Sequence, residues 1–422
     1  MPRVTPWVLN ALFALLMGLS TLAHGDDEDA LELQSAPAPG PANDSSLRAA
    51  LELGIGRIEQ RSDPRTENAN RVSFDVRYAM RLTDAWRLSL SDRLDRTHPA
   101  PASQPETSNS LREAYLAWQE PAGATSLDIG RVNLRQGPSY GYNPTDYFRS
   151  GALRAIPTAD PIALREMRMG TVMLWAGHLW SQGSASLAVA PKLDANPDES
   201  PASLDLGATN ARNRSLLTGN LRFSERISGQ GSLLVGTGQS PTIGASVTAL
   251  VTDSLVTYAE WSSGRMRSLL DLIQGSPAAA ERTQQVSAGL TYTFPGALSV
   301  TAEAEYNGAG LDRSGWDAVL SQGAAAYQRY LSITQSSQEL GSRRAWLLYA
   351  TQKNLGIKQL DATAFLRTNA VDHSHLAWAE LRYHWTRFDA ALQWQQSSGG
   401  AGTEFGVLPY RRVIQLLGVF FF

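Results

Sequence analysis

The residues best placed for chemistry are six arginines that lie between Gly130 and Gly170. They stand against only three acidic residues, so this segment carries an excess of three positive charges in a chain whose formal net charge is −3. Guanidinium groups remain charged at any ambient pH, and their donor forks fit carboxylate, sulfate or phosphate. Rings of such groups select anions in pores. The candidate site residues are Arg131, Arg135, Arg149, Arg154, Arg165 and Arg168, with Asp146, Asp160 and Glu166.

The composition of the same segment predicts an ordered structure. A connection of this length is usually either functional or disordered. Aromatic anchors and turn-forming pairs argue against disorder. They are Tyr140, Tyr142, Tyr147 and Phe148, and Gly137-Pro138, Asn143-Pro144 and Asp160-Pro161.

A structural role for these arginines is the alternative. Their partners would be Asp146, Asp160 and Glu166, together with carboxylates of flanking strands such as Glu113 and Glu303. Such pairing would fix the segment in place without selecting an anion, and the two roles can coexist.

The elements that would position the segment are β-strands, because polar and apolar residues alternate with a period of two. Val72, Phe74 and Val76 fall on one face, whereas Arg71 and Ser73 fall on the other. The same alternation returns at residues 286–294, 298–306, 377–385 and 388–394. We expect eighteen strands, with sixteen as the alternative, since single-chain barrels have even numbers. They lie near residues 48–60, 70–83, 86–96, 110–119, 124–133, 167–180, 183–192, 213–224, 228–238, 241–252, 254–264, 283–294, 297–306, 342–353, 358–369, 375–386, 387–397 and 408–422.

A soluble β-sandwich also alternates, but three features favour a membrane barrel. Aromatic residues often lie toward strand ends, short turns such as residues 294–298 alternate with long loops, and the chain ends on Phe422. We therefore predict an all-β, transmembrane, antiparallel up-and-down barrel over residues 47–422, with an inward-folded loop. Short turns would be periplasmic and long loops extracellular. Phe420 and Phe422 are the expected assembly signal for the barrel-assembly machinery.

The N-terminal region predicts export. Residues 1–23 have a basic start, a short apolar run and a small-residue cleavage site, which is typical of a signal peptide, with cleavage after residue 25 as the variant. A retained membrane helix is the alternative, but acidic residues rather than a stop-transfer pattern follow. Residues 24–46 are acidic and then rich in Ala and Pro, so they predict a disordered leader. The expected location is the outer membrane of a Gram-negative cell.

Composition excludes several classes of function. The chain has no cysteine, so it has no disulfide, no thiol chemistry and no lipoprotein anchor. Mean hydropathy is −0.23, too low for a helical membrane protein, and the net negative charge argues against a nucleic-acid surface. No motif for a cofactor or a structural metal is present.

The one dense cluster of catalytic residue types is Asp372-His373-Ser374-His375. Adjacent residues of an extended chain point in different directions, so the cluster is not itself a triad. His373 and His375 could bind a divalent metal adventitiously, but two ligands do not make a metal site. We therefore predict no enzyme and assign no catalytic residue, and an enzyme at the barrel rim is the least favoured hypothesis.

Two insertions do not follow the strand pattern. Residues 266–280 predict a loop or short helix. Residues 314–332 predict a helix, because Trp316, Leu320 and Tyr327 recur at helical spacing, and Ser314 with Asp317 resembles a capping box. This helix would cover the extracellular mouth.

Three short motifs carry a family resemblance: Gly130-Arg131, Asn143-Pro144-Thr145-Asp146 and Leu164-Arg165-Glu166. With the overall length and architecture, they resemble proteobacterial outer-membrane barrels of the alginate-export-like and uncharacterised porin-like type. The resemblance implies an eighteen-stranded exporter or porin with an arginine-rich constriction, in which Arg131, Arg135 and Arg149 face the pore. The chain departs from that type in having almost no lysine and no clear plug segment.

The expected function is an outer-membrane channel for anionic or carbohydrate cargo. The alternative is a closed barrel whose long loops bind an extracellular polymer. Expected partners are outer-membrane lipid and lipopolysaccharide, the barrel-assembly machinery, and a periplasmic export complex if the barrel is an export port. No nucleic acid is expected.

Overall fold

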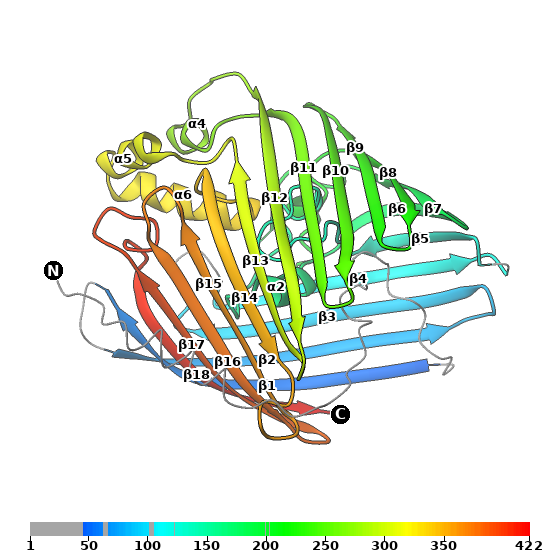
Figure 1. Ribbon diagram of the computed structural model, residues 1–422, viewed down its shortest axis with the longest axis horizontal. Helices are drawn as coiled ribbons and strands as arrows, with labels where there is room; N and C mark the ends of the chain where they lie inside the picture. Colours follow the sequence, from blue (N-terminus) through cyan, green and yellow to red (C-terminus); the bar gives the residue numbers. More distant parts are fainter. Residues whose placement is uncertain (1–44, 62–65, 101–104, 122, 199, 202) are drawn as a thin grey trace.

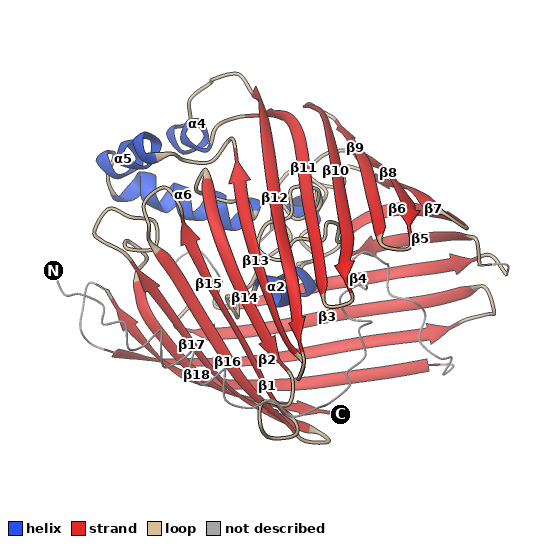
Figure 2. Ribbon diagram, in the orientation of Figure 1, coloured by secondary structure: helices blue, strands red, loops and turns tan. Residues whose placement is uncertain are grey.

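The computed structural model describes residues 45–61, 66–100, 105–121, 123–198, 200–201 and 203–422. Eighteen antiparallel strands each pair with their neighbours in the sequence, and β18 pairs with β1 to close the ring. Figure 1 shows this closed up-and-down barrel, and Figure 2 shows that helices make up only a small part of it. The predicted eighteen-stranded barrel is confirmed, and the alternative of sixteen strands is wrong.

The strands fall close to their predicted positions. The first nine are β1 Ser45–Gln60, β2 Thr66–Arg81, β3 Trp86–His98, β4 Thr107–Gln119, β5 Thr125–Val132, β6 Thr171–Trp180, β7 Gly183–Ala190, β8 Arg214–Ser224 and β9 Ile227–Gly236. The others are β10 Gln239–Thr252, β11 Leu255–Met266, β12 Glu281–Phe294, β13 Leu298–Asn307, β14 Arg344–Gln352, β15 Leu360–Asn369, β16 His375–His384, β17 Phe388–Ser398 and β18 Tyr410–Phe421. β1 begins slightly before the predicted boundary. The predicted signal peptide, and almost all of the predicted leader, lie outside the described residues.

The two ends of the barrel differ. Short turns join β2 to β3, β6 to β7, β8 to β9 and β10 to β11, and the first strand begins at this same end, since Ser45 pairs with Met80. Most connections at the opposite end are longer, above all residues 133–170, 191–213 and 308–343. In outer-membrane barrels the short turns are periplasmic and the long loops extracellular.

The polarity of the wall is the reverse of that in a soluble sandwich. On β2, Val72 and Phe74 are 48% and 45% exposed, whereas Arg71 and Ser73 are 6% and 1% exposed. Apolar side chains therefore face outward around the ring and polar ones face the lumen, so the sandwich alternative is wrong. Aromatic residues gather on the outside near the short-turn end; they include Trp180, Phe223, Phe294, Trp385 and Phe420. A barrel with this belt is an outer-membrane β-barrel.

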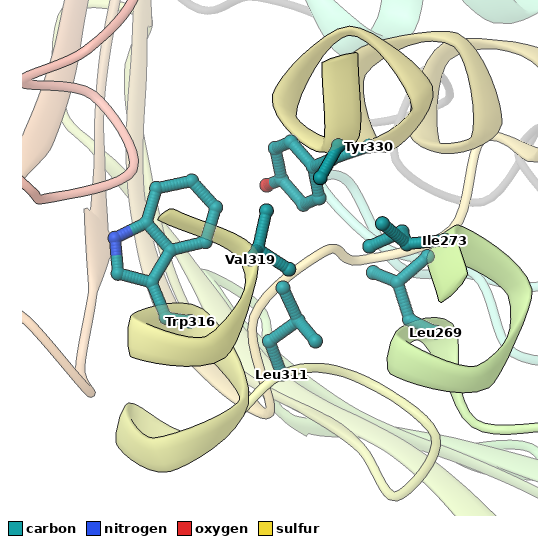
Figure 3. Packing of buried hydrophobic residues seen from close by; sticks show 7 residues of the cluster. Leu269, Ile273, Leu311, Trp316, Val319 and Tyr330 are labelled. Carbon is teal, nitrogen blue, oxygen red and sulfur yellow. The ribbon is translucent and has the colours of Figure 1, made fainter. Parts of the chain in front are cut away.

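Three helices form a cap at the long-loop end: α4 Leu269–Gln274, α5 Arg313–Ser321 and α6 Ala324–Ser337. We call them the helical cap. Figure 1 places them together beyond β12–β15. Figure 3 shows their shared core, in which Val319 of α5 lies between Trp316 and the α4 residues Leu269 and Ile273, and the Tyr330 ring of α6 points toward Trp316. Two further short helices, α2 Pro161–Glu166 and α3 Leu206–Thr209, lie in the loops 133–170 and 191–213. No helix in the described residues is long and apolar enough to cross a membrane.

The helix prediction is correct in place and wrong in detail. Residues 266–280 contain α4, as expected. The predicted helix 314–332 is two helices, because the chain turns at Gly323, whose φ is +79°. Asp312, not Ser314, caps α5 by accepting a hydrogen bond from the Gly315 amide at 2.9 Å, and Asp317 pairs with Arg313 instead. The capping-box interpretation is therefore wrong.

Candidate functional site

Residues 133–170, which we call the inward loop, fold into the lumen and contact the wall on several sides. Figure 1 shows α2 of this loop inside the ring. Arg71 of β2 donates to the Pro157 carbonyl, Arg154 donates to the Asn109 carbonyl of β4 at 2.9 Å, and Tyr147 is hydrogen-bonded to Ser232 of β9 at 3.1 Å. The predicted inward-folded loop is confirmed by these contacts.

Glu303 of β13 holds one turn of the loop. Its carboxylate accepts three consecutive backbone amides, from Tyr140 at 2.8 Å, Gly141 at 3.0 Å and Tyr142 at 3.1 Å. The Tyr258 hydroxyl donates to the same carboxylate at 2.7 Å. Consecutive amides that point to one side form an anion-binding concavity. Here a wall glutamate, only 2% exposed, fills that concavity.

Glu260 of β11 holds the next turn in the same way. It accepts hydrogen bonds from the Ser139 amide at 2.8 Å, the Thr145 hydroxyl at 2.9 Å and the Asn143 side-chain amide at 3.1 Å. Gly137, with a φ of +87°, lies so close that a Cβ there would meet the Glu260 carboxylate within 2.4 Å. The motif residues Asn143 and Pro144 are thus buried parts of an anchored turn.

Apolar contacts fix the two sides of the loop. Phe148 is 5% exposed and packs with Met173, Leu216 and Leu234 of β6, β8 and β9. On the opposite wall, Tyr140 and Ile162 pack against Leu347, Tyr349, Phe365 and Trp378 of β14, β15 and β16. The loop therefore spans the lumen between these two clusters.

Asp146 is the acidic centre of the loop itself. It is 1% exposed, accepts a hydrogen bond from Arg168 at 2.5 Å, and lies 3.7 Å from Arg165. Arg165 also donates to the Gln136 carbonyl at 2.7 Å. Two of the predicted pore arginines are thus buried and neutralised by a carboxylate, as the structural alternative expected.

Arg149 links the inward loop to the helical cap. It pairs at 2.5 Å with Glu339, which follows α6 and also accepts from the Tyr142 hydroxyl at 2.7 Å and from Gln285 of β12 at 2.9 Å. Burial by itself lowers the pKa of Arg149, but the facing Glu339 carboxylate raises it, and the net pKa lies above the ordinary value. The neighbouring Gln338 side chain accepts a hydrogen bond from Arg168 of the inward loop at 2.7 Å. The cap and the loop therefore form one connected assembly.

Arg131 and Arg154 bind the connection between β7 and β8. Arg131 donates to the Leu204 carbonyl at 2.6 Å and to the Thr209 hydroxyl at 3.2 Å, and Arg154 donates to the Ser203 carbonyl at 3.0 Å. Both arginines are buried, at 2% and 8% exposed. Gly130 directly precedes Arg131 and has a φ of +135°, a backbone conformation that L side chains rarely adopt. Arg131 thus packs against this connection rather than lining open space.

Asp160 begins α2 as its N-cap and accepts the Ile162 amide at 3.0 Å, with Pro161 in the first turn. The Tyr349 hydroxyl of β14 lies 3.3 Å from it. Burial raises the pKa of Asp160 to about 6. No arginine pairs with it in the described part of the chain, so the expected Asp160 ion pair is absent there. The Asp-Pro start of a helix is a signal that was visible in the sequence.

Arg135 is the loop arginine that remains open. Its side chain is 39% exposed and lies 3.8 Å from Glu166. Both line a cavity of about 230 Å³ between the loop and the wall strands β1–β4. The other charged groups that line it are Arg48, Arg77, Arg112 and Glu113.

The wall arginines of this cavity were not among the predicted site residues. Arg48 and Arg77 lie directly opposite each other in the β1–β2 register and are both exposed, whereas Arg112 is paired with Asp75 at 2.6 Å. Arg77 lies 3.7 Å from the same aspartate. Arg77 continues the polar face of Arg71 and Ser73 by the same alternation, but no sequence signal gives the register that brings Arg48 beside it. These four arginines stand against the two lining glutamates and Asp75, so the cavity keeps an excess of one positive charge.

The cluster from Asp372 to His375 forms a turn. Asp372 accepts the Ser374 hydroxyl at 2.6 Å and the Glu404 amide at 2.7 Å, and Ser374 is 1% exposed. Glu404 in turn accepts the Tyr330 hydroxyl of α6 at 2.6 Å. These contacts join the turn to the helical cap.

A buried-pair prediction follows from Asp146. Replacing it with Asn leaves Arg168 and Arg165 buried without a carboxylate, which costs about 3–5 kcal/mol for a broken buried pair. We expect amide hydrogen exchange in the inward loop to accelerate by about a hundredfold or more. Asp84→Asn is the matched control, because Asp84 is 99% exposed in its pair with Arg81. Unchanged exchange in Asp146→Asn would contradict the anchoring role.

Arg131 gives a second prediction. Replacing it with Gln should loosen residues 191–213 and increase their cleavage in limited proteolysis, because the donors to Leu204 and Thr209 are lost. Ion selectivity should not change. Arg96→Gln is the control, since Arg96 is 69% exposed in its pair with Glu106. A loss of anion preference without added cleavage would instead place Arg131 on the conduction path.

The fold and the anchored loop define an outer-membrane barrel whose lumen contains a folded loop. No family model matches the chain, and no curated protein matches it in sequence. Solved structures do match. OccAB1 of Acinetobacter baumannii has a TM-score of 0.56 at 10% identity, covering 91% of this chain and 98% of that one.

Two Pseudomonas aeruginosa structures are similar to the same degree. OccK5 (OpdH) has a TM-score of 0.55 at 10% identity, and OccK2 (OpdF), solved in complex with glucuronate, has 0.56 at 10% identity. Each covers 90% of this chain and 98% of its own. The particular fold is thus that of the Occ barrels. The eighteen strands that the alginate-export resemblance implied are confirmed, but these similar solved barrels are of the Occ type.

Proposed function

We propose that this protein is a channel for small anionic solutes, with the anion recognised by the arginines of the cavity below the inward loop. The observation that carries the proposal is the set of exposed guanidinium groups of Arg48, Arg77 and Arg135 around one cavity. Guanidinium forks suit carboxylates. The buried arginines of the inward loop hold its shape, so they contribute to selectivity by keeping the lumen narrow.

The size of the cavity favours a small solute over a polymer. Drug-sized ligands occupy sites of about 300–1,000 Å³, and this cavity is about 230 Å³. The lumen beside it is crossed by an anchored loop. A monosaccharide acid fits these limits, in keeping with the glucuronate complex of the structurally similar OccK2.

Liposome swelling tests the cargo class. Proteoliposomes should swell in glucuronate faster than in neutral glucose of similar size, and they should not swell in an oligomeric uronate. Equal rates for glucuronate and glucose would contradict anion recognition. Rapid entry of the oligomer would instead support polysaccharide passage.

The second candidate is a closed barrel that binds extracellular polymer. The observation that favours it is the helical cap at the long-loop end. The cap packs around its own hydrophobic core, and Glu339, which follows α6, pairs with Arg149 of the inward loop. Under this function no solute would swell the liposomes, and an acidic polysaccharide would bind the surface of intact cells.

A further inference from the structure

Two arginines lie directly opposite each other on the outer face of the barrel. Arg265 of β11 pairs in register with Arg282 of β12, and both side chains are exposed. Residues directly opposite in neighbouring strands have Cβ atoms only about 4.5–5.5 Å apart, and like charges there are destabilising. The repulsion between the two guanidinium groups therefore destabilises the folded barrel unless an anion lies between them.

The protein itself supplies no such anion within the described residues. Neither arginine forms an ion pair there, and the one side-chain hydrogen bond is from Arg282 to the Ser263 hydroxyl at 3.3 Å. Glu281 is adjacent in the chain, but alternation places it on the other face of β12. Most lumen arginines, by contrast, are paired with carboxylates, as in Arg93 with Asp95 at 3.0 Å.

The pair lies just beyond the apolar belt. Along the outer face of β12, the apolar residues run from Phe294 through Leu290, which is 43% exposed, to Val286, after which Gln284 and Arg282 are polar. Trp261 of β11 lies directly opposite Val286. Tryptophan marks the membrane interface. Because this is the long-loop end, the guanidinium groups lie at the headgroup level of the outer leaflet.

We infer that Arg265 and Arg282 form a binding site for the phosphate groups of an outer-leaflet glycolipid of the lipopolysaccharide type. Phosphate offers the charge and the several acceptor oxygens that two guanidinium groups can share. Its acyl chains would lie along the apolar face below, next to Trp261. Free phosphate has no such second contact, so the proposal is the phosphorylated lipid.

This site is separate from the proposed channel function. Arg265 and Arg282 project outward, whereas Glu260 and Ser262 of the same strand as Arg265 face the lumen and are 1% exposed each. A failure of lipid binding would therefore leave the cavity arginines and their solute unaffected.

The test is a thermodynamic cycle on the refolded full chain in detergent micelles. Lipid A and enzymatically dephosphorylated lipid A are titrated by calorimetry into the wild type and into Arg265→Gln with Arg282→Gln. We expect the double variant to bind lipid A at least about tenfold more weakly, because it loses the charge-assisted hydrogen bonds of both guanidinium groups to phosphate. Dephosphorylated lipid should bind both proteins equally weakly.

The control is Arg96→Gln with Arg226→Gln, which removes two exposed arginines that are already paired with Glu106 and Asp253. Its affinity should equal that of the wild type. Equal binding of lipid A by the wild type and the double variant would overturn the site, as would equal binding of both lipids by the wild type. The comparison of lipid A with dephosphorylated lipid A uses the wild-type protein alone, so it does not depend on how the variants fold. Full displacement of lipid A by millimolar inorganic phosphate would overturn the lipid assignment in favour of a simple anion site.

Discussion

Replacing both Glu260 and Glu303 with Gln is expected to release the inward loop and increase single-channel conductance. Each carboxylate accepts several donors of the loop, and Glu303 alone accepts three backbone amides. A side-chain amide has one acceptor oxygen and turns its own donors toward the remaining amides. Each buried donor left without a partner costs about 1–3 kcal/mol. The conductance should approach that of a variant that lacks residues 138–161.

The wall should remain intact in this variant, because strand pairing of β11 and β13 uses backbone groups that the substitutions do not change. A difference in gel migration between the unheated and the heated protein checks that the barrel has formed. Glu106→Gln is the matched control, since Glu106 is 48% exposed in its pair with Arg96. Wild-type conductance in the folded double variant would show that the two glutamates do not hold the loop.

Neutralising the open arginines of the cavity should remove most of the anion preference. The variant is Arg48→Gln, Arg77→Gln and Arg135→Gln together. At close approach in water, one unit charge attracts an anion with about 1 kcal/mol, which corresponds to roughly a fivefold change in local anion concentration. We expect the reversal potential in a salt gradient to move toward zero, and more strongly at low ionic strength, because salt screens exposed charges.

A triple variant of paired arginines outside the cavity is the control. Arg96→Gln, Arg226→Gln and Arg313→Gln remove the same total charge. These residues also lie near carboxylates, those of Glu106, Asp253 and Asp317, but none of them lines the cavity. Their loss should leave selectivity unchanged. If the two triple variants behaved alike, the preference would come from the overall charge of the protein and not from the cavity.

Much of the fold was predictable because a barrel wall repeats one local rule. Alternation such as Val72, Phe74 and Val76 against Arg71 and Ser73 gives the strand and its lumen face directly. The inward loop was predictable as an ordered element from its aromatic and turn-forming residues. Helix boundaries were less predictable. The expected helix is divided in two at Gly323, and this division depends on the positive φ of that single residue.

The partners of the loop arginines could not be obtained in the same way. Arg149 pairs with Glu339, far away in the sequence, and Arg131 binds residues 204–209, so both depend on how distant loops meet inside the ring. The structural alternative named the right kind of contact but not these partners. Glu303 was named as a partner for arginines, yet it binds backbone amides instead. The cavity arginines were missed because strand register, not composition, brings Arg48 and Arg77 together.

The most direct test of the proposed channel is the zero-current potential of the refolded wild-type protein in a planar bilayer across a potassium chloride gradient. We expect an open channel whose reversal potential has the sign of chloride preference, reduced in the triple variant of Arg48, Arg77 and Arg135. A cation-selective channel would contradict it. So would a barrel that is silent both as the wild type and as the Glu260→Gln, Glu303→Gln variant with its released inward loop.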